Sequence, residues 1–238
     1  MGLLHKMSLV LPYYDNPEML GIQYDAIRDL PDDVKANLEL IVIDDGSPTW
    51  PAMRPAMELG IPFRLFRIEV DVRWNWIAAR NIGVEHAAHP WVFLTDIDHV
   101  VPLETWRAVM SDSHLDTFAT YKFAREDYPH RTPYKPHPNT WMMTRKHMLQ
   151  RIGGYDERFS GYYGTDGEFR DRCQRAGKGI VERSDVIVRY HRDHVPDAAT
   201  NTYQRKQPED GENVPRIRKI IAASPAPHRL TFPFHEVE

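Results

Sequence analysis

The chain contains 238 residues, of which 42% are hydrophobic, 11% aromatic and 27% charged. This is a globular composition that allows a sizeable core, and it excludes general disorder and membrane helices, which need about 20 consecutive apolar residues. The net charge of −4 gives no basic field for nucleic acid, and the single cysteine, Cys173, excludes an intrachain disulfide. We expect a single-domain cytoplasmic protein without a transmembrane segment or a nucleic-acid partner.

The first half of the chain alternates strand patterns with helix patterns. Apolar runs predict strands at 8–11, 38–43, 63–68 and 91–95, and helical periodicity predicts helices at 17–30 and 76–88. Asn16 is expected to cap the first helix, with Pro17 at its first position. Strands separated by helices of this length predict an α/β fold with a mostly parallel central sheet flanked by helices.

The second half departs from this alternation. Strands are expected at 117–123, 141–144 and 186–190, and helices at 145–152, 165–175 and 214–223. The proline-rich segment 125–139 predicts a loop. We expect one domain over residues 1–202, followed by a polar C-terminal extension over 203–238.

Polar clusters follow three of the predicted strands. They are PYYD at 12–15, DDGS at 44–47 and DIDH at 96–99. Ligands of open α/β sheets bind beyond the carboxyl ends of the strands, so these clusters predict a ligand site at one sheet edge. Asp96 and Asp98 could hold a divalent cation through oxygen, or could cap the helix expected after Pro102. Their position alone leaves both alternatives open.

Six short segments carry a resemblance to known families. SLVLPYY at 8–14, LIVIDDGS at 40–47, ARNIG at 79–83 and FLTDID at 93–98 resemble GT-A fold glycosyltransferases of the family 2 type. GGYDERF at 153–159 and GYYGTDGEF at 161–169 resemble the catalytic region of β-1,4-galactosyltransferases and polypeptide N-acetylgalactosaminyltransferases. The resemblance implies a GT-A (Rossmann-like) fold with a nucleotide-binding half over about 1–100 and an acceptor and catalytic half over about 101–202.

The resemblance also implies roles on the donor side. Asp45, the second acid of the DDGS motif, would accept a hydrogen bond from the nucleotide base. Pro12 and Tyr14 would line the base and ribose site. Arg80, with Arg73 from the preceding loop, would lie near the diphosphate or ribose. The implied donor is a nucleotide-diphosphate sugar, with a UDP-sugar expected.

For the metal and the chemistry, the resemblance implies four further positions. Asp98 would be a direct metal ligand, and Asp96 would contact the ribose or a metal-bound water. His191 would complete the metal site, with His194 as the alternative. A carboxylate, an imidazole and diphosphate oxygens suit Mn²⁺, with Mg²⁺ as the second option. Asp166 would be the general base that takes a proton from an acceptor hydroxyl, on a saccharide or glycoconjugate, in a metal-dependent transfer with inversion.

Several alternatives stay open. The Glu-Asp pair of the resembling enzymes is Thr165-Asp166 here, and Thr165 with Glu168 also matches a helix capping box, which is a structural explanation. Glu168 is a second candidate for the base. A retaining transferase and a non-catalytic carbohydrate-binding protein on the same fold are the alternative functions. The sequence leaves the donor sugar, the acceptor and the oligomeric state undetermined.

Overall fold

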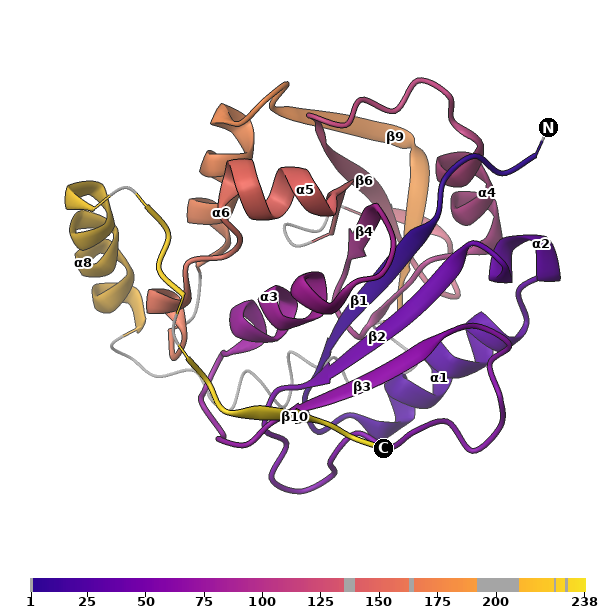
Figure 1. The fold of residues 1–238 in the computed structure, drawn as a ribbon, viewed down its shortest axis with the longest axis horizontal. Coiled ribbons are helices and arrows are strands. Elements are labelled where there is room, and N and C mark those ends of the chain that lie inside the picture. Colours follow the sequence, from indigo (N-terminus) through magenta and orange to yellow (C-terminus); the bar gives the residue numbers. More distant parts are fainter. Residues whose placement is uncertain (1, 135–139, 163–164, 192–209, 225, 230) are drawn as a thin grey trace.

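A computed structural model of the chain describes residues 2–134, 140–162, 165–191, 210–224, 226–229 and 231–238. These residues form one ten-stranded sheet flanked by helices (Figure 1). The strands are β1 (Met7–Tyr13), β2 (Leu38–Asp44), β3 (Phe63–Ile68), β4 (Trp91–Leu94), β5 (His99–Val100), β6 (Thr120–Asp127), β7 (Thr132–Tyr134), β8 (Trp141–Thr144), β9 (Ile180–Tyr190) and β10 (Phe234–Glu236). The α-helices are α1 (Pro17–Arg28), α2 (Asp32–Lys35), α3 (Trp76–His86), α4 (Leu103–Ser111), α5 (Arg145–His147), α6 (Asp166–Arg175) and α8 (Asp210–Ala223).

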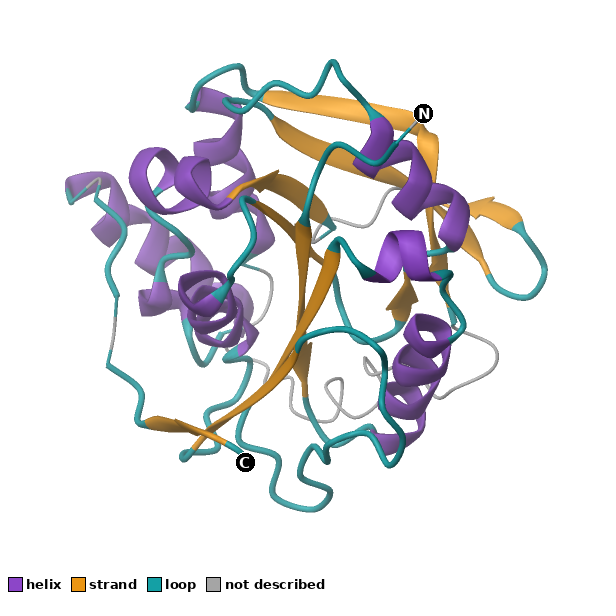
Figure 2. Cartoon of the chain, turned by 45° about the vertical axis from the view of Figure 1, so that its right-hand side comes forward, coloured by secondary structure: helices purple, strands orange, loops and turns teal. Residues whose placement is uncertain are grey.

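The sheet separates two layers of helices, which Figure 2 shows on either side of its central strands. α1 and α4 cover one face, and α3 and α6 cover the other (Figure 1). Alternate residues of β1 divide between the two cores: Leu9 and Leu11 pack on the α1 side, and Val10 packs on the α3 side. Because both faces are covered, all seven residues of β1 and all seven of β2 are buried.

The predicted α/β fold with a parallel centre is confirmed. β3, β2, β1 and β4 are neighbours and run parallel. Antiparallel strands extend this centre on both sides, with β10 beside β3 and β8 beside β4. Helix α3 packs on β1 and β2 as it carries the chain from β3 to β4. The order of strands therefore reverses between β1 and β4, which is where open α/β sheets bind ligands.

Helix α1 begins as its sequence predicts. The side-chain oxygen of Asn16 accepts a hydrogen bond from the backbone N–H of Met19 at 3.2 Å, and Pro17 is the first helical residue. The buried stripe of the helix includes Leu20, Tyr24 and Ile27, at helical spacing. This stripe packs α1 into the core on one face of the sheet.

Three segments differ from the expectation. The predicted loop at 125–139 is wrong in part, because β6 continues to Asp127 and pairs with β7. β9 starts at Ile180, six residues before the predicted 186. The first half of β9 is polar and mostly exposed, so its sequence does not predict a strand, and its pairing with β6 makes it one. The predicted helix at 145–152 is a short α-helix followed by a π-helical turn, Met148–Ile152, that Gly153 ends with a left-handed φ of 86°.

The described part of the C-terminal extension joins the same fold. β10 pairs antiparallel with the edge strand β3, as Figure 1 shows near the C-terminus. Arg64 of β3 makes two hydrogen bonds to Glu236, at 2.8 and 2.7 Å. Ile217 and Ile221 of α8 pack into the core on the α3 side. Among the residues that the structure describes, no helix has the length and apolar character needed to span a bilayer.

Candidate active site

The three polar strand ends meet at one edge of the sheet. β1 lies between β2 and β4 and runs parallel to both, so the motifs at 12–15, 44–47 and 96–99 follow neighbouring strand ends. The backbone N–H of Asp45 donates to the carbonyl of Tyr13 at 2.8 Å, which continues the pairing of β1 and β2 into the DDGS motif. The strand topology thus places these three motifs at the same edge of the sheet.

The two acids of the DDGS motif have different surroundings. Asp44 is fully buried, and its carboxylate accepts hydrogen bonds from the backbone N–H groups of Ser47 at 2.9 Å and Ala52 at 2.8 Å. Gly46 has a φ of 73°, and a Cβ there would lie 2.4 Å from the carbonyl oxygen of Val70. Asp44 and the glycine therefore shape the turn, and Asp45 stands beside them with 4% of its surface exposed.

Tyr14 connects the end of β1 with the loop before α3. Its hydroxyl donates to the carboxylate of Asp71, with oxygen distances of 3.2 and 3.3 Å. Arg73 belongs to the same loop and, like Tyr14, is half-buried. Pro12 is buried within β1, opposite Ile43 of β2. Tyr14 and Arg73 are thus partly accessible beside the site, and Pro12 lies beneath it.

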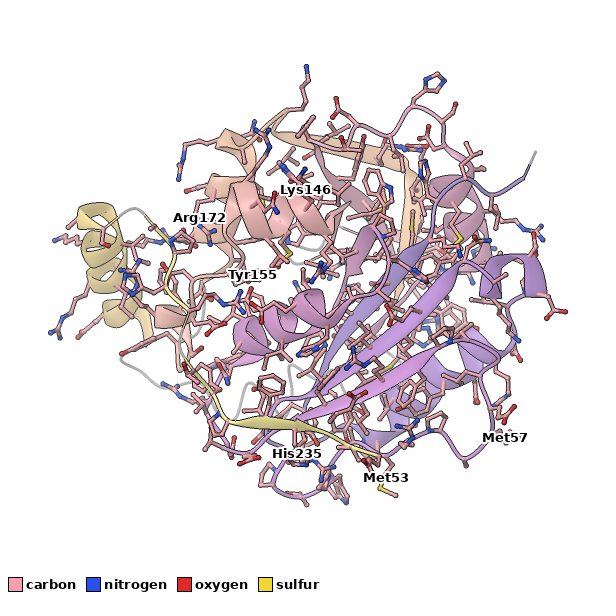
Figure 3. All side chains as sticks on the ribbon, in the orientation of Figure 1. Met53, Met57, Lys146, Tyr155, Arg172 and His235 are labelled. Atoms are coloured by element: carbon pink, nitrogen blue, oxygen red, sulfur yellow. The ribbon has the colours of Figure 1, made fainter. Side chains whose placement is uncertain are left out.

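Arg80, which the resemblance places near the diphosphate or ribose, is held beneath the surface by α3. It is fully buried on α3, where its guanidinium donates to the carboxylate of Asp96 at 2.6 Å and to the hydroxyl of Tyr155 at 2.9 Å. Figure 3 shows Tyr155 next to α3. Burial opposes the charge of Arg80, but Tyr155, Asp96 and Asp166 outweigh burial and raise its pKa. Arg80 therefore stays charged and fixes the position of Asp96.

Asp98 and His191 are brought together by backbone pairing. β5 and β9 are antiparallel, and the backbone N–H of His191 donates to the carbonyl of Asp98 at 3.0 Å. The side chain of Asp98 is 10% exposed. His191 is buried, with the ring of Tyr128 stacked on it at a centroid distance of 4.5 Å. His194, the alternative ligand, lies outside the described residues.

Asp98 and His191 are backbone neighbours across β5 and β9, and their side-chain types would suit a cation that also binds a diphosphate. Among the described residues no group of three or more His, Cys, Asp or Glu side chains is placed to hold a metal ion by itself. Mg²⁺ in phosphate-binding sites commonly has only one or two protein ligands, because phosphate oxygens and water complete its coordination. A carboxylate and an imidazole would meet this need and would also suit Mn²⁺.

The two candidates for the general base, Asp166 and Glu168, have different surroundings. Asp166 is the first residue of α6, half-buried, and close enough to Arg80 to affect its pKa. The carboxylate of Glu168 is held by Arg172 one turn later, with distances of 2.5 and 2.8 Å (Arg172 is labelled in Figure 3). The side chain of Thr165 makes no capping hydrogen bond, so the capping-box explanation of this segment is wrong.

Two buried residues of the site went unrecognised in the sequence. Gln23 of α1 is buried, and its side-chain amide donates to the carbonyls of Ile97 at 2.7 Å and His99 at 3.0 Å, within the DIDH turn. Tyr155 stacks on Phe169 of α6 at a centroid distance of 3.8 Å while it contacts Arg80. Gln23 lies in no motif, and the GGYDERF motif that contains Tyr155 gave no sign of its contact with Arg80, because both contacts join segments far apart in sequence.

Comparison with solved structures finds the same fold in three proteins of low sequence identity. TarS of S. aureus is 15% identical with a TM-score of 0.64, over 92% of this chain and 40% of TarS. The mannosyltransferase PcManGT of Pyrobaculum calidifontis, solved with GDP-Man and Mn²⁺, is 15% identical with a TM-score of 0.59, over 95% and 77% of the two chains. GalNAc-T7, solved with UDP, GalNAc and Mn²⁺, is 14% identical with a TM-score of 0.58, over 79% and 44%.

These similarities establish the fold, and the family comes from the sequence. The chain spans 40% of the length of TarS, so it corresponds to one part of that larger protein. No curated protein matches the sequence. The model of the family described as "Glycosyl transferase family 2" matches residues 8–165, which contain both the DDGS and the DID motifs. The chain therefore belongs to glycosyl transferase family 2 and has the fold of a GT-A glycosyltransferase.

Proposed function

We propose that the protein is a metal-dependent glycosyltransferase that moves a sugar from a nucleotide-diphosphate sugar, with a UDP-sugar expected, to an acceptor hydroxyl with inversion. One observation carries this proposal: Asp45 follows β2, and Asp96 and Asp98 follow β4, so these acids end the two strands that flank β1. Asp166 adds support, because it lies within electrostatic reach of Arg80, which binds Asp96. The acceptor proposed is a saccharide or glycoconjugate, and the cytoplasmic location stays a prediction.

The donor would lie along the carboxyl edge of the parallel strands. Asp45 would accept a hydrogen bond from the base, and Tyr14 would line the base and ribose with Pro12 beneath it. Asp96, held in place by Arg80 at 2.6 Å, would contact the ribose. Solved relatives support a nucleotide donor of this class, since TarS binds UDP-GlcNAc and PcManGT binds GDP-Man.

Asp98 and His191 would hold Mn²⁺ or Mg²⁺ against the diphosphate. When bound, such a cation supplies positive charge that neutralises the departing nucleoside diphosphate. Arg73, half-buried in the loop before α3, would add to this field. The Mn²⁺ present in the PcManGT and GalNAc-T7 structures supports the choice of cation.

Asp166 would act as the general base. Its carboxylate would take the proton of the acceptor hydroxyl as the acceptor oxygen attacks the anomeric carbon, and the bond from that carbon to the diphosphate oxygen would break on the opposite face. Glu168 is a poorer candidate because Arg172 already binds both of its oxygens, the second at 2.8 Å. The position of Asp166 at the start of α6 favours a negative charge there.

The direct test is product formation from a panel of UDP-sugars and GDP-sugars, each with Mn²⁺ and with EDTA. We expect release of UDP that needs the cation, together with a product of inverted anomeric configuration by NMR. A product of retained configuration would reject the inverting mechanism. Donor binding without transfer to any of a broad panel of saccharide acceptors would favour the non-catalytic alternative.

A further inference from the structure

We propose that His99, the fourth residue of the DIDH motif, is a positioning residue that orients the carboxylate of Asp98 toward the bound cation. This inference rests on the proposed function, because it assigns a role beside the cation ligand. His99 is fully buried and so does not itself reach the donor. Its effect on the reaction would pass entirely through Asp98.

The main chain of the DIDH turn is fixed at every residue from 96 to 99. The backbone N–H of His99 donates to the carbonyl of Asp96 at 3.0 Å, and that of His191 donates to the carbonyl of Asp98 at 3.0 Å. Gln23 binds the other two carbonyls, of Ile97 and His99. With the backbone held, the direction of the Asp98 carboxylate depends on its side-chain torsions and on the groups that bind it.

The ring of His99 is held by contacts at both nitrogens and by stacking on one face. Its Nδ1 lies 2.5 Å from Oδ1 of Asp98, and its Nε2 lies 3.1 Å from a guanidinium nitrogen of Arg125. Tyr190 stacks on the imidazole, with centroids 4.7 Å apart and planes inclined by 10°. The guanidinium of Arg125 also lies over the ring of Tyr190, 4.7 Å from its centroid. The imidazole therefore has one orientation.

The contact with Arg125 fixes the tautomer of His99. A guanidinium only donates hydrogen bonds, so Nε2 of His99 must accept. The ring proton then sits on Nδ1, which donates to Oδ1 of Asp98. A carboxylate held through one oxygen has a fixed plane, so the direction of its other oxygen is fixed as well. The relay from Arg125 through His99 thus prepares Asp98 to bind a cation.

Three substitutions of His99 separate this role from simple core filling. His99→Asn keeps an N–H donor close to the position of Nδ1, and His99→Gln places its amide near Nε2 and loses that donor. His99→Phe keeps a ring that can stack on Tyr190 and loses both hydrogen bonds. His147→Phe is the matched control, because His147 is also buried, at 1% exposed, and neither of its ring nitrogens has a hydrogen-bond partner among the described residues.

The measurement is the affinity for Mn²⁺ in the presence of saturating UDP, followed by the EPR signal of free Mn²⁺. Loss of an outer-shell partner typically weakens metal binding by about 10–100-fold, and we expect this for His99→Gln and His99→Phe. His99→Asn should bind Mn²⁺ within about threefold of wild type, as should His147→Phe. Thermal unfolding of each variant checks that it is folded.

The outcomes separate this inference from the proposed function. If wild type binds Mn²⁺ with UDP and His99→Gln and His99→Phe bind it equally well, the positioning role is overturned and the function stands. If wild type binds no Mn²⁺ with UDP, both fall. Should the His99 variants fail to fold, Arg125→Met tests the same relay, because it removes the donor that keeps the ring proton of His99 on Nδ1. We expect Arg125→Met to bind Mn²⁺ about three- to tenfold more weakly than wild type. Unchanged Mn²⁺ binding by this variant would overturn the positioning role.

Discussion

Asp166 and Asp171 lie on the same helix, α6, in very different surroundings. Asp166 is half-buried near Arg80, whereas the side chain of Asp171 is 58% exposed beside Arg170. We expect Asp166→Asn to lower kcat by about 10²–10⁴-fold, the usual contribution of a general base, with UDP affinity retained. Asp171→Asn should leave both quantities unchanged. Near-normal turnover by Asp166→Asn in a steady-state assay would reject the assignment.

At the residue scale, the sequence predicts best those positions whose neighbours in the chain carry the signal. Asp45, Asp96 and Asp98 follow buried strands directly, so their place at the sheet edge follows from strand order. The partners of Arg80 could not be predicted in this way. Tyr155 is 75 residues away in the chain, and the two meet only after α3 packs against the segment before α6.

At the element scale, Gly83 allows α3 to approach the sheet closely, because it has no Cβ. A Cβ on Gly83 would lie 2.4 Å from a methyl carbon of Val10 in β1 and 2.6 Å from one of Ile43 in β2. Both side chains are fully buried, so the helix would have to move outward. Gly83→Ala should therefore lower the free energy of unfolding by about 1–3 kcal/mol, as overpacking usually does.

Gly21 of α1 provides the matched control for this prediction. Apart from its chain neighbours and the backbone of its own helix, no heavy atom of the described residues lies within 4 Å of a Cβ built there. Gly21→Ala should therefore stabilise the protein by about 0.5–1 kcal/mol through backbone entropy and helix propensity alone. Urea unfolding of both variants measures the two effects. Equal stability of Gly83→Ala and wild type would contradict the close packing of α3.

Elements with continuous apolar runs or a capped amphipathic pattern were predictable, and elements that depend on a partner were not. β1, β2 and α1 have strong local patterns and lie where the sequence predicts them. β5 has only two residues and exists through its pairing with β9. β10 carries an exposed Phe-His-Glu sequence that becomes a strand by pairing with β3.

At the scale of the whole molecule, three histidines couple folding to pH. Burial lowers the pKa of His86, His89 and His147 below the usual value near 6.5. Between those lowered values and about 6.5 the unfolded chain binds more protons than the folded one, so stability falls as pH falls through this window. We expect a lower midpoint of urea unfolding at pH 5.5 than at pH 7.5.

His147 lets one contribution to this pH dependence be isolated. Neither of its ring nitrogens has a hydrogen-bond partner among the described residues, and nearby Arg151 adds to the effect of burial on its pKa. His147→Phe removes one titrating group, so stability should depend less steeply on pH between 5.5 and 7.5 in this variant, while His86 and His89 still contribute. The same slope in this variant and in wild type would show that His147 takes no part.

The central claim is that this sheet edge binds a nucleoside diphosphate through a cation held by Asp98, and calorimetric titration of UDP with Mn²⁺ or EDTA tests it most directly. We predict binding that requires Mn²⁺ and weakens at least about tenfold in Asp98→Ala, since even outer-shell changes cost that much. Asp33→Ala, whose side chain is 59% exposed, should bind like wild type. Equal UDP binding with Mn²⁺ and with EDTA, or in Asp98→Ala and wild type, would contradict the account.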